Sequence, residues 1–484
     1  MPLNTAVNEE RSARERVLTI NQAMEGVELF SGARATPPPG QNSTFRLAPE
    51  PFFADEQLIE ELSLLGEHFL AFLKAADHLY LQSRRQHIPA FFHEYLDQGK
   101  PEQVLDFARQ KRFRRSLPLV IRPDILLTEE GPVVTELDAV PGGMGLLDFL
   151  SRQYAAMGYR IVGGPDGLAK NFAAALTGLC PEVVDPLAAV VVSDESGDFR
   201  GEMQWLAQQM QSLMRICVCH PRDLLFIADA LYLDVPVGAA GEKRRQKVDI
   251  LYRFFELFDL KNIPQIDLIL YAARKEMAAF TPPVKAHLEE KSLFALLHHP
   301  VLQHYWAELL GDSRLHLLKK LLPETWILDP RPLPPQAVIP GLSIGGRPLT
   351  DFRELGEATQ KERQLVIKPS GFSPLAWGSR GVVIGADHPS EVWAKAIEDA
   401  LASFSQVPHI LQRFHKSKRV KMPYYDFTEG AIKIMQGRVR LCPYYFVHHD
   451  QAHLSGVLAT IVPLDKKAIH GMVDAVMVPV ALRR

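Results

Sequence analysis

An arginine and three acidic residues recur at even spacing in two apolar runs near residue 130. The first run contains Arg122 and Asp124, the second contains Glu136 and Asp138, and Gly131 lies between the runs. A three-residue hairpin loop needs glycine at its left-handed position, so we expect a β-hairpin whose turn is centred on residue 130. That register places Arg122 opposite Asp138, and it places Asp124 opposite Glu136. Because opposed residues and residues two apart share a face, we expect the four side chains to form one ionic patch.

This patch has the composition of a magnesium site. Asp124, Glu136 and Asp138 offer hard oxygen ligands, which suit Mg²⁺ shared with the phosphates of a nucleotide. The alternative is a solvated hairpin face with ordinary ion pairs, because charge clusters also occur for structural reasons. A register shift of one residue would separate the pairs. The four residues alone leave both interpretations open.

A second candidate site begins at Lys368, which ends the apolar strand predicted over 364–368. The loop that follows, 370–385, contains Gly371, Gly378, Gly381 and Arg380. Unobstructed backbone amides next to a lysine and an arginine suit a polyphosphate. The chain contains no Walker A motif, G-x-x-x-x-G-K-[ST], so this would be a different kind of phosphate loop. The alternative is an ordinary surface loop, because glycine is common in turns.

The run Gly341 to Gly345 matches the G-x-S-x-G pattern of a serine nucleophile, with Ser343 at its centre. A nucleophile elbow needs a strand before the serine and a helix after it. Prolines precede this run, and Gly346, Arg347 and Pro348 follow it. Both requirements therefore fail, and a serine hydrolase that uses Ser343 remains only as an alternative.

Two further clusters have metal-binding residue types. Cys217, Cys219 and His220 form a Cys-x-Cys-His run, but no partner pair lies nearby, so core and surface thiols are the favoured interpretation. The run 448–453 holds three histidines and Asp450, and its flanking tyrosines indicate a strand followed by a loop. Ligand spacing there would require a helix, so a zinc site is not favoured.

Composition limits the class of protein. A chain of 484 residues is too long for one core, so two or three domains are expected. The net charge of −3 gives no general attraction to nucleic acid or to anionic membranes. Four cysteines are too few for a disulfide scaffold, and no signal peptide or apolar run of membrane-spanning length is evident. We therefore expect a cytoplasmic protein with small-molecule partners, and the sequence indicates no oligomeric state.

Periodicity predicts the elements that position these residues. From residue 55 apolar residues recur at helical spacing, whereas strands at 187–192 and 215–219 flank a helix over 201–214. The last third is predicted as sheet with helices: strands at 364–368 and 409–414, a hairpin turning at 436–437, and a strand over 454–462. The fold class is thus α/β (α+β), with central mixed or antiparallel sheets, a small Rossmann-like α/β unit and an N-terminal helical region.

Together these segments resemble the ATP-grasp enzymes, and specifically the circularly permuted, glutathionylspermidine synthase-like group. That group has an R-x-D strand followed, twelve residues after the aspartate, by E-x-N, and a lysine strand much later in the chain. The matching segments here are R-P-D at 122–124, E-L-D at 136–138, V-I-K-P at 366–369, LLKKLLPET at 317–325 and ILQRF at 410–414. The resemblance covers about residues 116–145 and 300–462.

The resemblance implies an ATP- and Mg²⁺-dependent ligase for a small carboxylate and an amine. In such enzymes the carboxylate attacks the γ-phosphate, an acyl phosphate forms, and the amine displaces phosphate to give an amide. The implied domains are an N-terminal arm with helices over 1–115, a metal-binding hairpin over 116–150, an α/β substrate-side region over 151–300, and a nucleotide-binding part over 301–484. A nucleotide-binding protein of the same fold without turnover is the main alternative.

The resemblance also implies roles for individual residues. Asp124, Glu136 and Asp138 would bind Mg²⁺, with Asp138 in place of the usual asparagine. Arg122 would be catalytic and hold the transferring phosphoryl group. The nucleotide would be bound by Lys320 (with Lys319 as its competitor), Lys368, Gly378, Ser379, Gly381 and Gln412. Gly378 to Gly381 would close over the triphosphate, and Gln412 stands where many relatives carry glutamate in contact with adenine or ribose.

Overall fold

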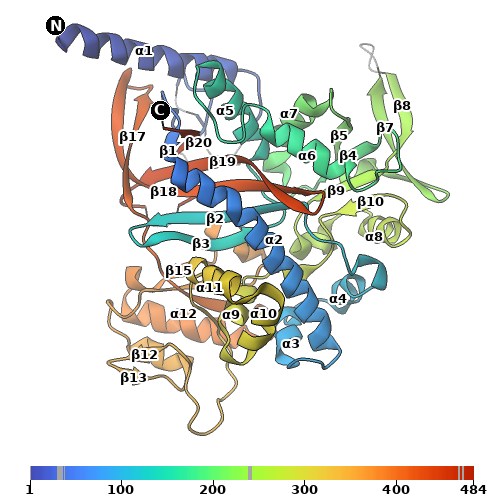
Figure 1. Ribbon diagram of the computed structural model, residues 1–484, viewed down its shortest axis with the longest axis vertical. Coiled ribbons are helices and arrows are strands. Elements are labelled where there is room, and N and C mark those ends of the chain that lie inside the picture. Colours follow the sequence, from blue (N-terminus) through green and yellow to red (C-terminus); the bar gives the residue numbers. More distant parts are fainter. Residues whose placement is uncertain are drawn as a thin grey trace.

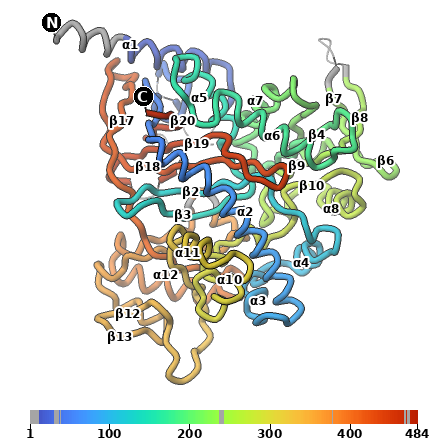
Figure 2. Tube along the Cα trace, in the orientation of Figure 1, coloured from blue at the N-terminus to red at the C-terminus, as the bar shows by residue number. Residues whose placement is uncertain are grey.

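The computed structural model describes residues 2–29, 36–37, 39–237, 242–466, 469–470 and 474–483, without the side chains of 2–11, 236–237, 242, 377 and 379. Its centre is a seven-stranded sheet, and smaller sheets and helices lie around it (Figure 1). The tube in Figure 2 shows that the first strand and the last strands, although distant in sequence, lie in this one sheet. None of the helices in the described ranges is long and apolar enough to cross a membrane.

The central sheet has the strand order β1-β20-β19-β18-β2-β3, and β17 pairs with β18 beside this path. The strands are β1 (Phe52–Ala54), β2 (Val120–Thr128), β3 (Gly131–Asp138), β17 (Arg419–Asp426), β18 (Ala431–His448), β19 (Gln451–Pro463) and β20 (Val476–Leu482). Neighbours are antiparallel, except that β1 is parallel to β20. The sheet thus combines segments from both ends of the chain.

Alternation along β18 assigns the two faces of this sheet. Arg438, Arg440, Cys442 and Tyr444 line a cavity on one face. The intervening Val439 and Leu441, like Tyr445 beyond a bulge, are buried in the core. Helix α2 (Glu56–Arg84) lies across this second face, where the Tyr445 hydroxyl donates to Leu62 O (2.5 Å; Figure 1). The predicted helical spacing from residue 55 is confirmed, because Leu62, Leu65, Phe69, Phe72 and Leu73 are buried.

The prediction of a hairpin that turns at 436–437 is wrong. Gly437 lies inside the continuous strand β18 and pairs with Pro463 of β19. A Cβ on Gly437 would lie 2.6 Å from Val462 O. Glycine there permits close approach of a neighbouring strand, which is the other common role of glycine in a sheet interior. The turns that end β18 lie instead at 427–430 and 449–450.

The predicted small α/β unit is present as a four-stranded parallel sheet, order β10-β9-β4-β5. Its strands are β4 (Leu187–Val192), β5 (Arg215–Cys219), β9 (Ile250–Phe254) and β10 (Ala279–Thr281). Helices α5 (Met144–Ala156), α6 (Gly167–Thr177), α7 (Arg200–Met210) and α8 (Ile266–Arg274) belong to the same region. A ribbon of β6 (Leu225–Ile227), β7 (Ala230–Val237) and β8 (Glu242–Lys247) projects at one edge (Figure 1, upper right).

A third sheet, order β11-β16-β14-β15, carries the lysine strand. It comprises β11 (Thr325–Ile327), β14 (Leu365–Pro369), β15 (Val383–Ile384) and β16 (His409–Arg413). Helix α12 (Ser390–Ala402) covers it with a core that includes Trp393 and Ile397. The 3-10 helix η8 (Pro374–Ser379) lies between β14 and β15. The lysine strand is thus fixed from behind by an apolar layer.

The remaining helices surround these sheets. They are α1 (Pro2–Ala23), α3 (Phe91–Asp97), α4 (Glu102–Ala108), α9 (Ser292–His298), α10 (Gln303–Leu310) and α11 (Asp312–Leu321), and the 3-10 helix η5 (Ala286–Glu289) precedes α9. The segment with Ser343 forms the two-residue strand β12 (Ser343–Ile344), paired with β13 (Arg347–Pro348) at the lower end of Figure 1. Ser343 is exposed and no helix follows it directly, so the structure lacks a nucleophile elbow there.

Candidate functional site

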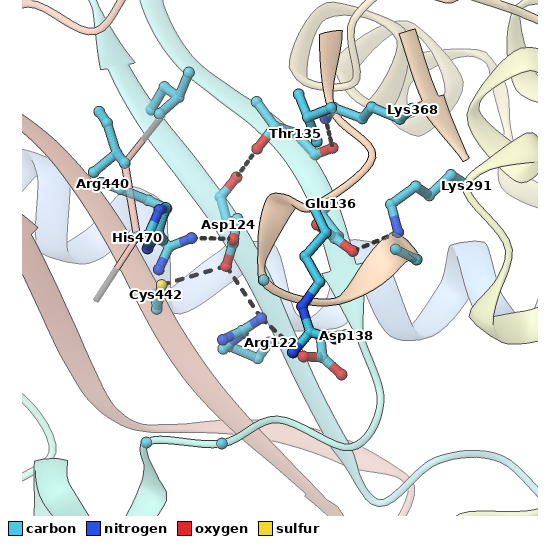
Figure 3. A pocket seen from close by; sticks show the side chains of 18 of the residues that line it. Arg122, Asp124, Thr135, Glu136, Asp138, Lys291, Lys368, Arg440, Cys442 and His470 are labelled. Atoms are coloured by element: carbon cyan, nitrogen blue, oxygen red, sulfur yellow. Dashed lines mark hydrogen bonds and ion pairs between the residues drawn. The ribbon is translucent and has the colours of Figure 1, made fainter. Parts of the chain in front are cut away.

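A cavity of about 640 Å³ lies where the central sheet faces the lysine sheet. Its walls include the β2–β3 hairpin, β18, β14, β16, the end of β9 and the segment 194–199 that follows β4. Figure 3 shows side chains from these distant segments pointing toward one another. Most of the residues selected from the sequence meet here: Arg122, Asp124, Glu136, Asp138, Lys368, Gly378 and Gln412 all line the cavity.

The hairpin gives its charged residues their predicted partners, although its turn is the two-residue loop 129–130, with Thr128 opposite Gly131, and not the predicted three-residue loop. Arg122 pairs with Asp138, Asp124 pairs with Glu136, and a bulge follows Asp124. The Arg122 guanidinium lies 2.8 Å from Asp138 Oδ2 and 3.4 Å from Asp124 Oδ1. Arg440 Nη1 donates to Asp124 Oδ2 (2.6 Å), and Cys442 Sγ donates to Asp124 Oδ1 (3.3 Å; Figure 3). Asp124 is therefore bound from two strands.

The three carboxyl groups differ in their electrostatic surroundings. Burial alone would raise the pKa of Asp124, but the guanidinium groups of Arg122 and Arg440 outweigh it and lower that pKa. Burial likewise opposes the ammonium of Lys291 at Glu136, whose pKa is lowered. At Asp138 burial prevails over Arg122, and the pKa is raised. Asp138 is thus the carboxyl of the three that accepts a proton most readily.

Each carboxylate of the patch is paired with a cation. Within the described ranges no three histidine, cysteine or acidic side chains are arranged to hold a metal ion. The donor set nevertheless fits Mg²⁺ in kind, because three carboxylates line one cavity. In the described part of the chain the buried Nε atoms of Arg122 and Arg440 have no hydrogen-bond partner, so this cavity also has unused capacity for an anion. Assignment of the metal ligands stays a prediction.

Lys368 connects the lysine sheet to the acidic hairpin. Its Nζ donates to Thr135 O (3.0 Å) on β3 and to Gln412 Oε1 (2.8 Å) on β16. Burial lowers the pKa of Lys368 to about 8. Gln412 is buried and also donates to Thr325 Oγ1 (3.3 Å). A lysine that is desolvated this far and aimed at a cavity is a candidate for binding an anion.

A further lysine of the cavity is Lys291, which no sequence motif indicated. It lies just before α9, and its Nζ is 2.7 Å from Glu136 Oε1 (Figure 3). The predicted Lys320 is instead exposed on α11 and does not line the cavity, because Leu315, Leu318 and Leu321 direct the opposite face of that helix to the core. The competing Lys319 binds Gln303 Oε1 (2.8 Å) beside a second cavity. The sequence signal that could have indicated Lys291 was its position between Glu290 and the apolar residues of α9.

The loop 370–385, called the glycine loop below, lies at the edge of the cavity. Gly378 has a φ of +61° and lines the cavity together with Arg380, which is 4.0 Å from Glu195. Gly381 donates its amide to Leu375 O (2.9 Å), and a Cβ there would lie 2.9 Å from the Pro369 ring. Ser379 ends η8, but its side chain lies outside the described residues. The loop is thus compact and close to the lysine strand.

The contacts that hold the turn after Asp138 were also not predicted. Tyr444 donates to Gly142 O (2.6 Å), and the Glu202 carboxylate accepts from Gly143 N (2.6 Å) and Leu146 N (3.3 Å) at the start of α5. Burial raises the pKa of Glu202 to about 7. These contacts fix the turn that follows Asp138. The motifs contained no sign of them, because Glu202 lies on a different helix.

The other metal-type clusters have structural surroundings. Burial raises the pKa of Cys217 to about 12, and the pKa of the buried Cys219 is also raised. His220 Nε2 lies 3.1 Å from Asp194 Oδ1. At the tip of the β18–β19 hairpin the rings of His448 and His453 stack with centroids 3.9 Å apart, which does not direct their nitrogens at one point. Neither cluster forms a metal site within the described residues.

Comparison with known proteins supports the fold. No protein-family model matches the chain, and no curated protein sequence matches it. Among solved structures it is similar to a glutathione synthetase-like effector from Globodera pallida, with a TM-score of 0.56, 10% identity and 97% of each chain covered. It is also similar to a putative gamma-glutamylcysteine synthetase from Methylobacillus flagellatus KT, with a TM-score of 0.41, 11% identity, and 90% and 89% coverage of the two chains. The first similarity establishes the fold alone: the predicted mixed α/β class with several sheets is confirmed.

Proposed function

We propose that this protein is an ATP- and Mg²⁺-dependent ligase that joins a small carboxylate to an amine through an acyl phosphate. One observation carries the proposal: Lys368 donates to the backbone of β3 at Thr135, so the cationic strand and the acidic hairpin, 233 residues apart, form one cavity. The finer resemblance, to the circularly permuted glutathionylspermidine synthase-like group, supports it through the motifs at 122–124, 136–138 and 366–369.

The residues divide into cationic and anionic groups around the expected triphosphate. Lys368, Lys291 and the amides near Gly378 would bind its phosphates, and Arg122 with Arg440 would stabilise negative charge at the phosphoryl group in transfer. Mg²⁺, held by Asp124, Glu136 and Asp138, would supply further charge neutralisation. In the structure these three carboxylates form ion pairs with Arg122, Lys291 and Arg440. The nucleotide and the metal ion together would therefore replace internal ion pairs.

The reaction then consists of two displacements. A carboxylate oxygen of the acid forms a bond to the γ-phosphorus while ADP leaves, giving an acyl phosphate. The amine nitrogen then bonds to the acyl carbon, phosphate leaves, and the amine gives up a proton. The cavity contributes by positioning the reactants and by stabilising charge on the transferred group, since phosphoryl transfer requires little covalent chemistry from the protein.

Two measurements test the proposal. Isothermal titration with MgATP measures binding, and ADP release with a panel of small carboxylates and amines measures turnover. We expect binding in the wild type and binding weaker by at least about tenfold in Lys368→Ala. Binding without turnover across a broad panel would favour the nucleotide-binding alternative, and absence of MgATP binding would remove the basis of the ligase.

A further inference from the structure

The start of α9 presents consecutive charged residues to different parts of the molecule. Lys291 reaches Glu136 in the cavity. The preceding Glu290 is buried, and its Oε1 accepts from the Ser370 hydroxyl (2.5 Å) while its Oε2 accepts from Gly371 N (3.3 Å). Ser370 and Gly371 begin the glycine loop. The Glu290 carboxylate thus joins the segment that carries Lys291 to the loop that follows Lys368.

The contact between these two segments is close along the backbone as well. A Cβ on Gly371 would lie 2.1 Å from Glu289 O, so only glycine allows the loop to rest on the segment before α9. Ser370 N donates to Pro408 O (2.8 Å), and the Ser370 hydroxyl also accepts from Phe372 N (3.1 Å). The Ser370 hydroxyl therefore links the first turn of the loop to Glu290 by two hydrogen bonds: it accepts from Phe372 N and donates to the Glu290 carboxylate.

The charge of Glu290 is balanced from the N-terminal helical region. Lys100 Nζ lies 2.7 Å from Glu290 Oε1, and both side chains are shielded from solvent. The ammonium lacks the angular geometry of a hydrogen bond, so this contact is an ion pair without one. A buried carboxylate is costly without a counter-charge. Lys100 supplies it, which leaves the carboxylate oxygens as strong acceptors for the loop.

The segment before α9 is itself held firmly. Glu289 pairs with the buried Arg253 of β9, a strand in the interior of the parallel sheet. Upstream, Lys285 and His287 each lie 2.8 Å from the carboxylate of Asp77 on α2. Glu290 therefore projects from a fixed support rather than from a free loop.

We propose that Glu290 is a positioning residue that holds the loop 370–381 against the Lys291 segment. This inference rests on the proposed function. The contacts of Glu290 with Ser370 and Gly371, called the tether below, keep the loop amides at a fixed distance from Lys368 and Lys291, so that these groups bind a triphosphate as a single preorganised unit. Glu290 acts through Ser370 and Gly371 and does not itself contact the nucleotide.

The test compares two serines of the same loop. Ser370→Ala removes the bond to Glu290, whereas the control Ser373→Ala removes a buried hydroxyl that accepts from Leu375 N (3.3 Å) inside the loop. Titration with MgATP and hydrogen exchange of peptides covering 371–381 in the nucleotide-free protein are measured for both. We expect Ser370→Ala to weaken MgATP binding about tenfold, the equivalent of one charge-assisted hydrogen bond. We also expect faster exchange in this loop and a melting temperature close to that of the control.

Two further variants separate positioning from general stability. Ser370→Thr retains a hydroxyl and is expected to restore slow exchange and most of the affinity. The double variant Lys100→Met/Glu290→Met removes both buried charges and the acceptor oxygens together, so it avoids an orphaned ion, and it is expected to reproduce the Ser370→Ala loss. Equal exchange and equal MgATP affinity in Ser370→Ala and Ser373→Ala would overturn the tether. A wild type that fails to bind MgATP would instead overturn the proposed function, and the exchange data would still decide whether the tether exists.

Discussion

Single residues at the cavity balance desolvation against charge. Lys368 is buried enough that its pKa falls to about 8, yet its two acceptors are an uncharged carbonyl and an amide oxygen. Lys291, by contrast, has Glu136 as a partner and a raised pKa, although burial opposes this. Lys368 is therefore the cation of the two that gains more from an arriving anion. This difference makes it the first residue to test.

Lys368→Ala is expected to weaken MgATP binding by at least about tenfold while leaving the melting temperature unchanged or slightly higher. The reason is that a desolvated ammonium with neutral partners costs folding free energy but attracts the triphosphate. Thermal melts with and without MgATP provide the measurement. The matched control is Lys320→Ala, an exposed lysine outside the cavity, which is expected to bind as the wild type does. An equal loss in both variants would contradict the assignment.

Glu202 predicts a dependence of stability on pH. Its pKa is raised on folding from 4.5 to about 7, so the folded protein binds the proton more tightly than the unfolded chain. The stability it contributes is complete below about pH 4.5 and is lost as the pH rises through about 7, an effect of about 3 kcal/mol in the free energy of unfolding.

Glutamine has no group that titrates, so Glu202→Gln is expected to abolish this dependence of the free energy of unfolding on pH. Relative to the wild type, the variant is expected to gain stability between about pH 5 and about pH 8, as measured by urea unfolding at both values. A difference between variant and wild type that stays constant with pH would show that Glu202 is ionised in the folded protein throughout.

At the scale of elements, local patterns were informative where strand partners are close in sequence. The β2–β3 hairpin was predictable from its apolar alternation, but its register was not fixed by Gly131. Thr128 pairs with Gly131 across a two-residue turn, and the predicted pairs of charged residues form because the bulge after Asp124 shifts the register by one. The long strand β18 was not, because Gly437 suggests a turn and only its contact with β19 reveals a close approach. Lys291, Arg440 and Glu202 were missed for a related reason. Lys291 and Arg440 reach the cavity through tertiary packing, Glu202 lies behind its wall at the start of α5, and none of the three belongs to a spaced motif.

The crossing of α5 and α7 gives an element-scale prediction. A Cβ on Gly145 would lie 2.0 Å from Glu202 O, a backbone atom that cannot rotate away. Gly145→Ala is therefore expected to lower the free energy of unfolding by about 1–3 kcal/mol through overpacking, measured by urea unfolding. A Cβ on Gly197 would meet no atom within 4 Å, so Gly197→Ala is the control, expected within about 0.5 kcal/mol of the wild type. Equal stability of the two variants would contradict the crossing.

At the scale of the whole molecule, the cavity joins an acidic hairpin to a cationic sheet. The comparison with solved structures supports the fold and does not bear on the chemistry of this cavity. The pair Lys291–Glu136 connects the segment before α9 to the central sheet, and the pair Arg440–Asp124 joins two neighbouring strands of that sheet. A triphosphate alone would compete with three carboxylates for the same cations. A divalent cation removes that conflict.

We therefore expect ATP to stabilise the protein against heat only together with Mg²⁺. At a ligand concentration of about 100 times Kd the gain is about 2.7 kcal/mol, and excess EDTA is expected to abolish it. Differential scanning fluorimetry with ATP, MgATP, and MgATP plus EDTA provides the comparison, with Mg²⁺ alone as the control. Equal stabilisation by ATP in EDTA would show that the carboxylates do not hold a metal ion for the nucleotide.

The pairing of β2 with β18 has a consequence for biosynthesis. Asp124 and its partner Arg440 are 316 residues apart, so at ordinary rates of translation the hairpin waits roughly 15 to 60 seconds on the ribosome for this neighbour. During that delay the nascent hairpin displays an open strand edge on which Arg122 is the one cation of the patch beside Asp124 and Asp138, a state in which chaperones commonly engage a polypeptide. Nucleotide-binding ability would then arise late and all at once, when the second half of the sheet emerges.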